Sequence, residues 1–471
     1  MLVRNATLAD GRRRDVQVRG ERIDAVGRRL SAEGGTENGR DDDEAEAERV
    51  IDATGKLLLP GAIDVHVHAR EPGFPYKETW ETLSASAAAG GVTTVVDQPN
   101  TDPPTIDGER FDAKAELATR SLVDYGINGG VTPEWEPGEL LERPLFALGE
   151  IFLADSTGEM GIDADLFEAA VREATERGVA TTVHAEDAAL FSETARERDG
   201  DDVDGWSAFR TIEAEVEAIA QACTVGAELG AQLHIAHAST PEGIDRAKDA
   251  GMTCEVTPHH LFLSRADLDE LGTCGRMNPP LRSEDCRKAV YERVADGTVD
   301  VIATDHAPHT RTEKDTDVWN APSGVPGVET LLPLLLAEAR EGKLSYERVR
   351  DLTAANPAAI FDLPRKGRVE AGKDADLALF DPETAREIRG EERHSKAGWT
   401  PFEGSEGVFP EWTMVRGQVI YERTDDESWD VDGSSDGGSG DGDGGDSDER
   451  FGGAIGENVR WSSRAAANDD N

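Results

Sequence analysis

Ile63-Asp64-Val65-His66-Val67-His68 is an apolar strand that ends in two histidines, and similar short strands recur along the chain from residue 56 onwards. Between them lie segments with apolar residues at positions i, i+3 and i+4, the pattern of an amphipathic helix. Repeated strand–helix units predict a parallel sheet covered by helices, and six or more over about 300 residues favour a closed barrel. The other strands are 57–59, 93–96, 180–183, 233–236, 253–256 and 299–303, and the helical segments include 161–178, 208–230 and 241–250.

Both ends of the chain show short strands outside this repeat. Residues 2–28 alternate apolar and polar side chains. Short strand-like segments occur again at 375–380 and 413–421. Because each set of strands needs partners, we expect the two ends to form one small composite β-sandwich domain beside a distorted TIM (β/α)8 barrel. The expected boundaries are 1–55 and 361–423 for the β domain and 56–360 for the barrel.

Two acidic stretches interrupt or follow these units, namely a loop at residues 32–48 and a tail at residues 424–471. Both are poor in apolar side chains and cannot bury enough surface to offset the entropy of ordering. We therefore expect the loop and most of the tail to be disordered. The segment Phe451-Gly452-Gly453-Ala454-Ile455 within the tail shows no pattern that predicts a structure.

The 471-residue chain has a formal net charge of −47, from 96 acidic and 49 basic residues. Such a charge repels nucleic acid and excludes a function in binding it. Self-repulsion on this scale is tolerable where salt shortens the Debye length to about 3 Å at molar concentration, so the composition favours a halophilic source. The alternative, that the two acidic stretches alone produce the charge, is incomplete because an acidic excess persists without them.

The cysteines and the apolar runs indicate a cytoplasmic protein. The four cysteines form no CxxC pair and no small disulfide framework, which fits a reducing compartment. No apolar run approaches the roughly 18 residues of a membrane span, and the chain opens into a polar strand instead of a signal sequence. We expect no membrane association.

His66 and His68 are the first candidate metal ligands. Residues two apart on a strand point to the same side, so both imidazoles can reach one metal. Neutral imidazole suits zinc, and barrel enzymes build their sites at the carboxyl ends of strands. The pair alone is a weak signal, and two histidines that bond only to backbone are the alternative.

Three more polar residues end later strands: His184, His237 and Asp305. Five ligands exceed the three of a usual catalytic zinc site, so two metals that share a bridging carboxylate are the economical interpretation. Asp305 is then the expected general base and acid. The alternative for Asp305 is a hydrogen-bond acceptor outside the ligand set.

Further motifs surround these residues, namely Asp64-Val65-His66-Val67-His68-Ala69-Arg70-Glu71-Pro72-Gly73, Asp97-Gln98-Pro99-Asn100-Thr101, Met277-Asn278-Pro279-Pro280-Leu281, Thr304-Asp305-His306-Ala307-Pro308-His309 and Trp399-Thr400-Pro401-Phe402-Glu403-Gly404. Together they resemble the class I dihydroorotases of the amidohydrolase superfamily, over residues 1–422.

The resemblance implies two zinc ions (Zn2+) per chain and the reversible cyclisation of N-carbamoyl-L-aspartate to L-dihydroorotate in pyrimidine biosynthesis. By this analogy His66, His68 and Asp305 hold one metal, and His184 and His237 hold the other. The residues that it implies for substrate binding are Arg70, Asn100, Asn278 and His309. A planar guanidinium pairs well with a carboxylate, which agrees with the role of Arg70.

One departure from the family concerns the bridge between the metals. Many relatives use a carbamylated lysine there, but no lysine occurs between Lys114 and Lys248. Glu150 stands where that lysine would align and offers two oxygens, so we expect it to be the bridging ligand. Asp155 is the rival, and a bridge made by water alone is the third possibility.

The remaining histidines have structural roles in this interpretation. His234 would point away from His237 on the same strand, and His259 and His260 are expected to serve packing or hydrogen bonds beside the site. Residues 306–328 are long enough to cover a substrate, with a solvent-exposed connection as the alternative.

Two other functions compete with dihydroorotase. Allantoinase and dihydropyrimidinase share the metal motifs, but their substrates lack the carboxylate that Arg70 and Asn100 would bind. A metal-free scaffold homologue is the other alternative, although every expected histidine is present. The sequence leaves open whether the protein forms a homodimer or associates with an aspartate transcarbamoylase.

Overall fold

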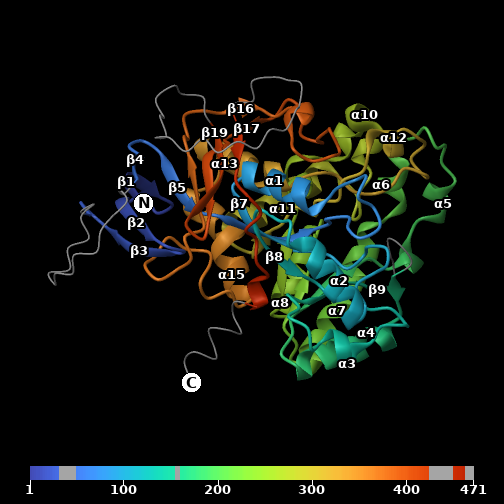
Figure 1. Cartoon of the computed structure of the whole chain (residues 1–471). Coiled ribbons are helices and arrows are strands. Elements are labelled where there is room, and N and C mark those ends of the chain that lie inside the picture. Colours follow the sequence, from blue (N-terminus) through green and yellow to red (C-terminus); the bar gives the residue numbers. More distant parts are fainter. Residues whose placement is uncertain (31–48, 154–159, 424–448, 462–471) are drawn as a thin grey trace.

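Eight parallel strands of mostly apolar, buried residues form a barrel at the centre of the molecule (Figure 1). The computed structural model describes residues 1–30, 49–153, 160–423 and 449–461. The parallel bridges Gly129–Leu148 and Val67–His306 join the two barrel sheets and close the ring. In ring order the strands are β6 (Ala62–Val67), β7 (Val92–Asp97), β8 (Asp124–Ile127), β9 (Leu148–Leu153), β11 (Thr181–Ala185), β12 (Leu233–Ile235), β13 (Thr253–Val256) and β14 (Val301–Ile302).

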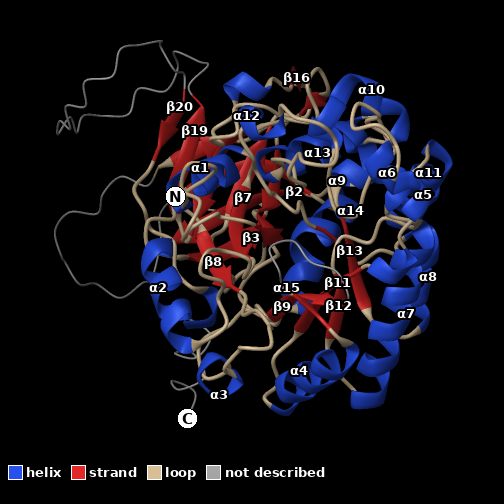
Figure 2. Ribbon diagram, turned by 90° about the vertical axis from the view of Figure 1, so that its right-hand side faces the viewer, coloured by secondary structure: helices blue, strands red, loops and turns tan. Residues whose placement is uncertain are grey.

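Helices surround these strands and cover the barrel (Figure 2). Their starts follow local sequence rules: Thr211, for example, caps α7 (Ile212–Leu229) by accepting a hydrogen bond from Ala214 N. The helix ends at Gly230, whose φ of 62° favours glycine. The other long helices are α1 (Trp80–Ala89), α2 (Gly108–Ala118), α4 (Ala164–Glu176), α8 (Pro241–Asp249), α11 (Glu284–Asp296) and α13 (Leu331–Arg340).

Shorter elements lie between these helices or follow them. They are α3 (Pro137–Leu140), β10 (Gly161–Ile162), α5 (Glu193–Arg196), α6 (Gly205–Phe209), α9 (Pro258–Phe262), α10 (Leu268–Leu271), α12 (Arg311–Lys314), α14 (Tyr346–Arg350), α15 (Asn356–Ile360), β16 (Arg386–Glu387) and β17 (Glu406–Gly407). Within the described ranges, every helix is too short or too polar to cross a membrane.

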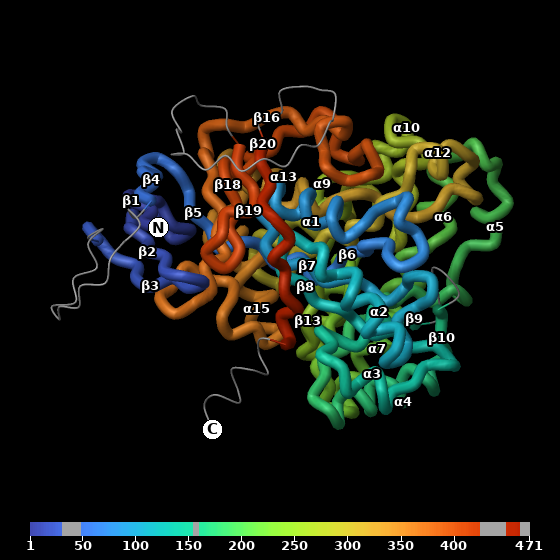
Figure 3. Tube along the Cα trace, in the orientation of Figure 1, coloured from blue at the N-terminus to red at the C-terminus, as the bar shows by residue number. Residues whose placement is uncertain are grey.

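A nine-stranded sheet combines both ends of the chain, which lie side by side as blue and orange-red tubes in Figure 3. Its central pair is β5 (Leu57–Pro60) with β15 (Leu377–Phe380), which run antiparallel. Side chains from both ends share one apolar core, so the expected barrel with a composite β domain is confirmed. The other strands are β1 (Leu2–Leu8), β2 (Arg13–Arg19), β3 (Arg22–Gly27), β4 (Val50–Asp52), β18 (Pro410–Val415), β19 (Gln418–Arg423) and β20 (Glu449–Phe451).

Residues 57–59 were expected among the barrel strands, and this assignment is wrong. They lie in β5, which pairs with β1 and β15 in the composite sheet. All four residues of β5 are buried, because the strand lies in the middle of that sheet. A central strand of a mixed sheet therefore has the same continuous apolar pattern as a barrel strand.

Part of the acidic tail, residues 449–461, has a defined structure. β20 extends the composite sheet beside β19, and residues 452–461 continue along the barrel. Tyr125 N donates to Glu457 O at 3.0 Å, and Asn458 is fully buried. A Cβ on Gly456 would lie 2.1 Å from Val123 O, so only glycine fits there. The loop at 32–48 and the rest of the tail lie outside the described residues.

Candidate metal centre

The expected metal ligands meet at the carboxyl ends of the barrel strands. His66 and Glu150 lie within β6 and β9, His184 lies near the end of β11, and His237 and Asp305 follow β12 and β14. All of these side chains are buried, as is His68 directly after β6. The strand-end pattern in the sequence therefore identified residues that the barrel brings together in space.

Two of these residues have an unusual backbone conformation. His237 and Asp305 have φ angles of 34° and 46°, in the left-handed region that residues with a Cβ rarely adopt. Arg70, which follows the histidine pair, has a φ of 65°. Local strain of this kind concentrates at functional sites, where the surrounding fold holds the residue in place.

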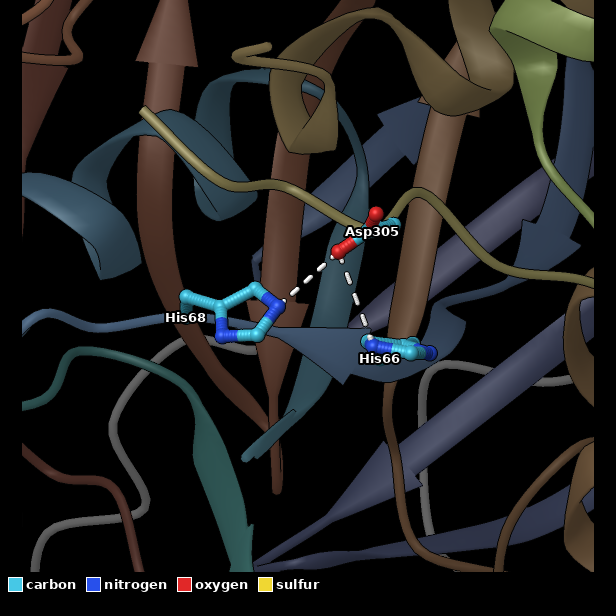
Figure 4. A group of neighbouring side chains, drawn as sticks. All are labelled: His66, His68 and Asp305. Carbon is cyan, nitrogen blue, oxygen red and sulfur yellow. Dashed lines mark hydrogen bonds and ion pairs between the residues drawn. The ribbon is translucent and has the colours of Figure 1, made fainter. Parts of the chain in front are cut away.

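His66, His68 and Asp305 form the first group, whose ligand atoms all lie within 4.8 Å of one another. Both imidazoles point toward the carboxylate of Asp305 (Figure 4). Asp305 Oδ1 lies 2.9 Å from His68 Nε2 and 3.6 Å from His66 Nε2. Two imidazole nitrogens and a carboxylate oxygen are a ligand set suited to zinc.

His66, Glu150 and His237 form the second group, whose ligand atoms also lie within 4.8 Å of one another. Glu150 connects the histidines of the site. Its Oε1 lies 2.6 Å from His237 Nε2 and 3.0 Å from His184 Nδ1, while its Oε2 lies 3.3 Å from His66 Nε2. The two oxygens of one carboxylate thus face different histidines, which is the arrangement that a bridging ligand needs. Asp155, the rival for this position, lies outside the described residues.

The pocket is chemically suited to positive charge. Burial opposes ionisation of the His184 imidazole, but Glu150 and Glu186 outweigh it and raise its pKa to about 10. Burial raises the pKa of Asp305, yet His68 and His66 hold it lower, at about 2. His66 Nε2 finds no hydrogen-bond partner in the described part of the chain. Buried carboxylates and an unpartnered nitrogen fit a site for metal cations.

Two glutamates that the sequence analysis did not single out orient the histidines. Glu255 Oε1 lies 2.6 Å from His66 Nδ1, and Glu186 Oε2 lies 3.2 Å from His184 Nε2. Arg210 holds Glu186 through its Nε and Nη2 groups at 3.2 and 2.5 Å. Carboxylates behind ligand histidines fix the ring orientation and raise the basicity of the metal-facing nitrogen.

The pocket beside the two groups contains three of the four expected substrate-binding residues. Arg70, Asn100 and Asn278 line it together with the metal-site residues His68, Glu150, His184, His237 and Asp305. Asn100 also contacts the metal site, because its Oδ1 lies 2.7 Å from His68 Nδ1. The amide nitrogen of Asn100 is then the end directed away from that ring.

His309 is not among the lining residues of the pocket but lies directly behind Arg70. Its Nε2 is 2.9 Å from Ser323 O and 3.1 Å from Arg70 Nη2, and its Nδ1 is 3.1 Å from Lys77 Nζ. Burial, together with Arg70 and Lys77, holds the pKa of His309 well below its usual value. A neutral His309 can donate to Ser323 O and accept from Lys77 at the same time.

Known proteins resemble this chain over most of its length. The model of the amidohydrolase family matches residues 57–420. This chain belongs to the amidohydrolase family. Dihydroorotase from Halobacterium salinarum is 60% identical over 423 residues, 89% of this chain and 96% of that protein. Dihydroorotase from Methanosarcina mazei is 47% identical over 402 residues, 82% of this chain and 88% of that protein. The halobacterial relative supports the halophilic source that the net charge indicates.

Solved hydantoinase structures share this fold over most of the chain. L-hydantoinase from Arthrobacter aurescens superposes with a TM-score of 0.82 at 29% identity, and the match covers 89% of this chain and 96% of that one. D-hydantoinase from Thermus sp. gives a TM-score of 0.80 at 26% identity, with 98% of both chains covered. The resemblance inferred from the sequence motifs is thus confirmed at the level of the family and the fold.

The other histidines of this amidohydrolase have contacts outside the two metal groups. His234 Nδ1 is 2.8 Å from Thr253 Oγ1, and its Nε2 is 3.2 Å from Glu255 Oε2. His260 Nε2 is 3.0 Å from Pro279 O, in the turn that follows Asn278. His259 is buried beside His260, with ring centroids 4.5 Å apart.

The two ends of the segment 306–328 line one side of the pocket, while residues 311, 312, 315, 316 and 320 in its middle are exposed. Ser323 and Gly324 line the pocket, and most of residues 318–328 are buried. The backbone of His306 bridges to Val325, so the segment returns to the barrel edge. The ends of the segment are therefore part of the pocket wall in this amidohydrolase.

Proposed function

We propose that this chain is a dihydroorotase that interconverts N-carbamoyl-L-aspartate and L-dihydroorotate with two zinc ions. The observation that carries the proposal is the position of Arg70 in the same pocket as both metal-binding groups. A metal centre supports the opening of a cyclic amide, and a guanidinium beside it suits a ring that bears a carboxylate. Dihydroorotases up to 60% identical to the chain support the same activity.

The ligand geometry divides the proposed metal sites between two sets of residues. One zinc would be held by His66, His68 and Asp305, the other by His184 and His237, and Glu150 would bridge them through its two oxygens. Zinc in this position activates water and polarises a carbonyl. Two metals explain why six buried ligand residues converge where one zinc needs three or four.

Asp305 is the proposed general base and acid. It lies in the pocket with its Oδ1 against His68, and its low pKa keeps it ionised and able to accept a proton. In ring opening, its carboxylate would take a proton from the attacking water and deliver one to the departing ring nitrogen. Ring closure would use the same group in the reverse order.

The carboxylate of the substrate would lie against Arg70, Asn100 and Asn278. Arg70 Nε donates to Pro308 O at 3.2 Å, which fixes the direction of the guanidinium plane. His309 packs directly behind Arg70 and, in this proposal, limits the movement of its guanidinium by contact. The pocket then binds the charged end of the ring at this wall and the amide to be cleaved at the metals.

A hydantoinase or dihydropyrimidinase activity is the alternative that the solved structures favour. The two proposals differ in the need for a carboxylate on the ring. Turnover of L-dihydroorotate, dihydrouracil, hydantoin and allantoin by the zinc-loaded protein in high salt separates them. We expect turnover of dihydroorotate. Turnover of the uncharged rings should be at least about 100-fold lower, because they lack the carboxylate that would pair with Arg70. Preference for dihydrouracil, hydantoin or allantoin would refute the proposal.

The proposed setting of the enzyme is the cytoplasm of a halophilic cell. All four cysteines are unpaired thiols, as is usual in a reducing compartment. The net charge of −47 suits high ionic strength, where screening reduces repulsion between carboxylates.

A further inference from the structure

Trp206 in α6 contacts the turn that carries Asn278. Its indole Nε1 lies 3.1 Å from Asn278 Oδ1 and 3.1 Å from Met277 O. An indole N–H can only donate a hydrogen bond. The oxygen of the Asn278 side chain therefore faces Trp206, and its NH2 group is directed away from the indole.

Asn100 has the same arrangement on its side of the pocket. Its Oδ1 faces Nδ1 of His68, whose Nε2 is the atom next to Asp305. When Nε2 serves as a ligand atom, Nδ1 carries the proton and donates to Asn100. Both amides thus have their oxygens bound by ring N–H groups and their nitrogens directed elsewhere.

These two amides share the pocket with Arg70, whose guanidinium also only donates. A wall of hydrogen-bond donors is complementary to a carboxylate. An Asn278 amide in the opposite orientation would bring its oxygen toward the same anion and repel it. The orientation of this amide therefore bears on which substrates the pocket accepts.

The surrounding contacts hold the indole of Trp206 in place. The guanidinium of Arg276 lies 3.6 Å from the centre of the Trp206 ring, and the Trp319 ring packs at 6.1 Å. Arg276 itself is fixed, because its Nη1 donates to Val318 O at 2.8 Å and its Nε to Ser323 Oγ at 3.2 Å. The donor to Asn278 is thus part of a rigid cluster.

We propose that Trp206 is a positioning residue that sets the orientation of the Asn278 amide and so makes this position of the pocket a donor to the substrate carboxylate. The inference rests on the proposed dihydroorotase function and deepens it. Trp206 acts through Asn278 and does not itself line the pocket. Its effect therefore concerns substrate affinity and the preference for charged rings.

The variant Trp206→Phe tests the proposal, because it keeps an aromatic ring over Arg276 and removes the N–H group. We expect the KM for L-dihydroorotate to rise about 10-fold, as for one weakened hydrogen bond to an anion, with kcat within about 2-fold of the wild-type value. Trp319→Phe is the matched control, since its indole lies in the same cluster but donates to Arg198 O at 3.1 Å. It should leave KM unchanged.

A double-mutant cycle with Asn278→Ala shows whether Trp206 acts through that amide. In the Asn278→Ala background, Trp206→Phe should add no further rise in KM. An unchanged KM in the single variant would overturn the proposal. An equal rise in KM in the wild-type and Asn278→Ala backgrounds would also overturn it. The same holds if KM rises in Trp319→Phe as well and the thermal midpoint of both single variants is lowered. Absence of dihydroorotate turnover in the wild-type protein would instead refute the proposed function, and it is measured first.

Discussion

Glu255 Oε1 lies 2.6 Å from Nδ1 of His66 and also accepts a hydrogen bond from the backbone N of His237 at 3.3 Å. One buried carboxylate thus contacts a histidine that belongs to both metal groups and the backbone of a second ligand. Burial raises the pKa of Glu255, but His66 and His234 outweigh burial and hold the pKa well below its usual range. An ionised Glu255 directs Nε2 of His66 toward Glu150 and Asp305.

The variant Glu255→Gln should therefore weaken metal binding. We expect zinc affinity to fall about 10- to 100-fold, the usual effect of removing a carboxylate behind a ligand histidine. Competition with a chelator, followed by metal analysis, measures this without reference to activity. His234→Gln is the control, because it changes the contact between Glu255 and His234 and leaves the pair with His66 intact. Two tightly bound zinc ions in Glu255→Gln would contradict this role.

Glu150→Ala tests the bridge between the metals. Because the two oxygens of Glu150 face different histidines, we expect the variant to retain fewer than two zinc ions per chain and to lose at least about 100-fold in kcat, as when a group that stabilises the transition state is removed. Asp155→Ala should keep both metals and most of the activity. The reverse outcome would assign the bridge to Asp155.

Arg70→Lys keeps the positive charge but loses the planar pair of donors. We expect the KM for L-dihydroorotate to rise about 10- to 100-fold, because a bidentate pair with a carboxylate becomes a single contact. Any residual turnover of dihydrouracil should be unaffected. If both substrates lose activity equally, Arg70 serves the structure of the pocket and not the recognition of the carboxylate.

His394 predicts a pH dependence of stability. It lies 3.1 Å from Glu329 and 3.1 Å from Glu449 of β20. Burial opposes its protonation, but the two glutamates raise its pKa to about 9, above the ordinary 6.5. The stabilisation is therefore complete below about pH 6.5 and lost as the pH rises through about 9. The thermal midpoint of the wild-type protein should fall toward that of His394→Gln over this range. A constant difference between the two proteins would contradict the assignment.

The sequence predicted the parts of the site that follow strand ends. His66, His184, His237 and Asp305 could be located because a short apolar strand precedes each of them. Glu255 and Glu186 were missed, although a glutamate inside the apolar strand Thr253–Val256 was an available signal of a buried charge pair. Trp206 could not be found, because its contact with Asn278 joins a short helix to a turn 72 positions later in the chain.

The fold was predicted as far as local pattern determines it. Alternating strands and helices indicate a barrel, but the apolar run 57–60 looks the same in a barrel and in the middle of the composite sheet. The ordered segment 449–461 follows a long acidic stretch, and its position depends on contacts with Tyr125 and Val123 that no local pattern encodes. Contacts between segments so far apart in the sequence are determined by the folded barrel.

The most direct test of the central claim is a zinc titration of the chelator-treated protein in high salt, with turnover of L-dihydroorotate as the measured quantity. The two-metal dihydroorotase predicted here gains activity with added zinc and reaches its maximum at two ions per chain, and it also closes N-carbamoyl-L-aspartate to the ring. Full turnover without metal, or a zinc-loaded protein that leaves dihydroorotate unchanged, would contradict it.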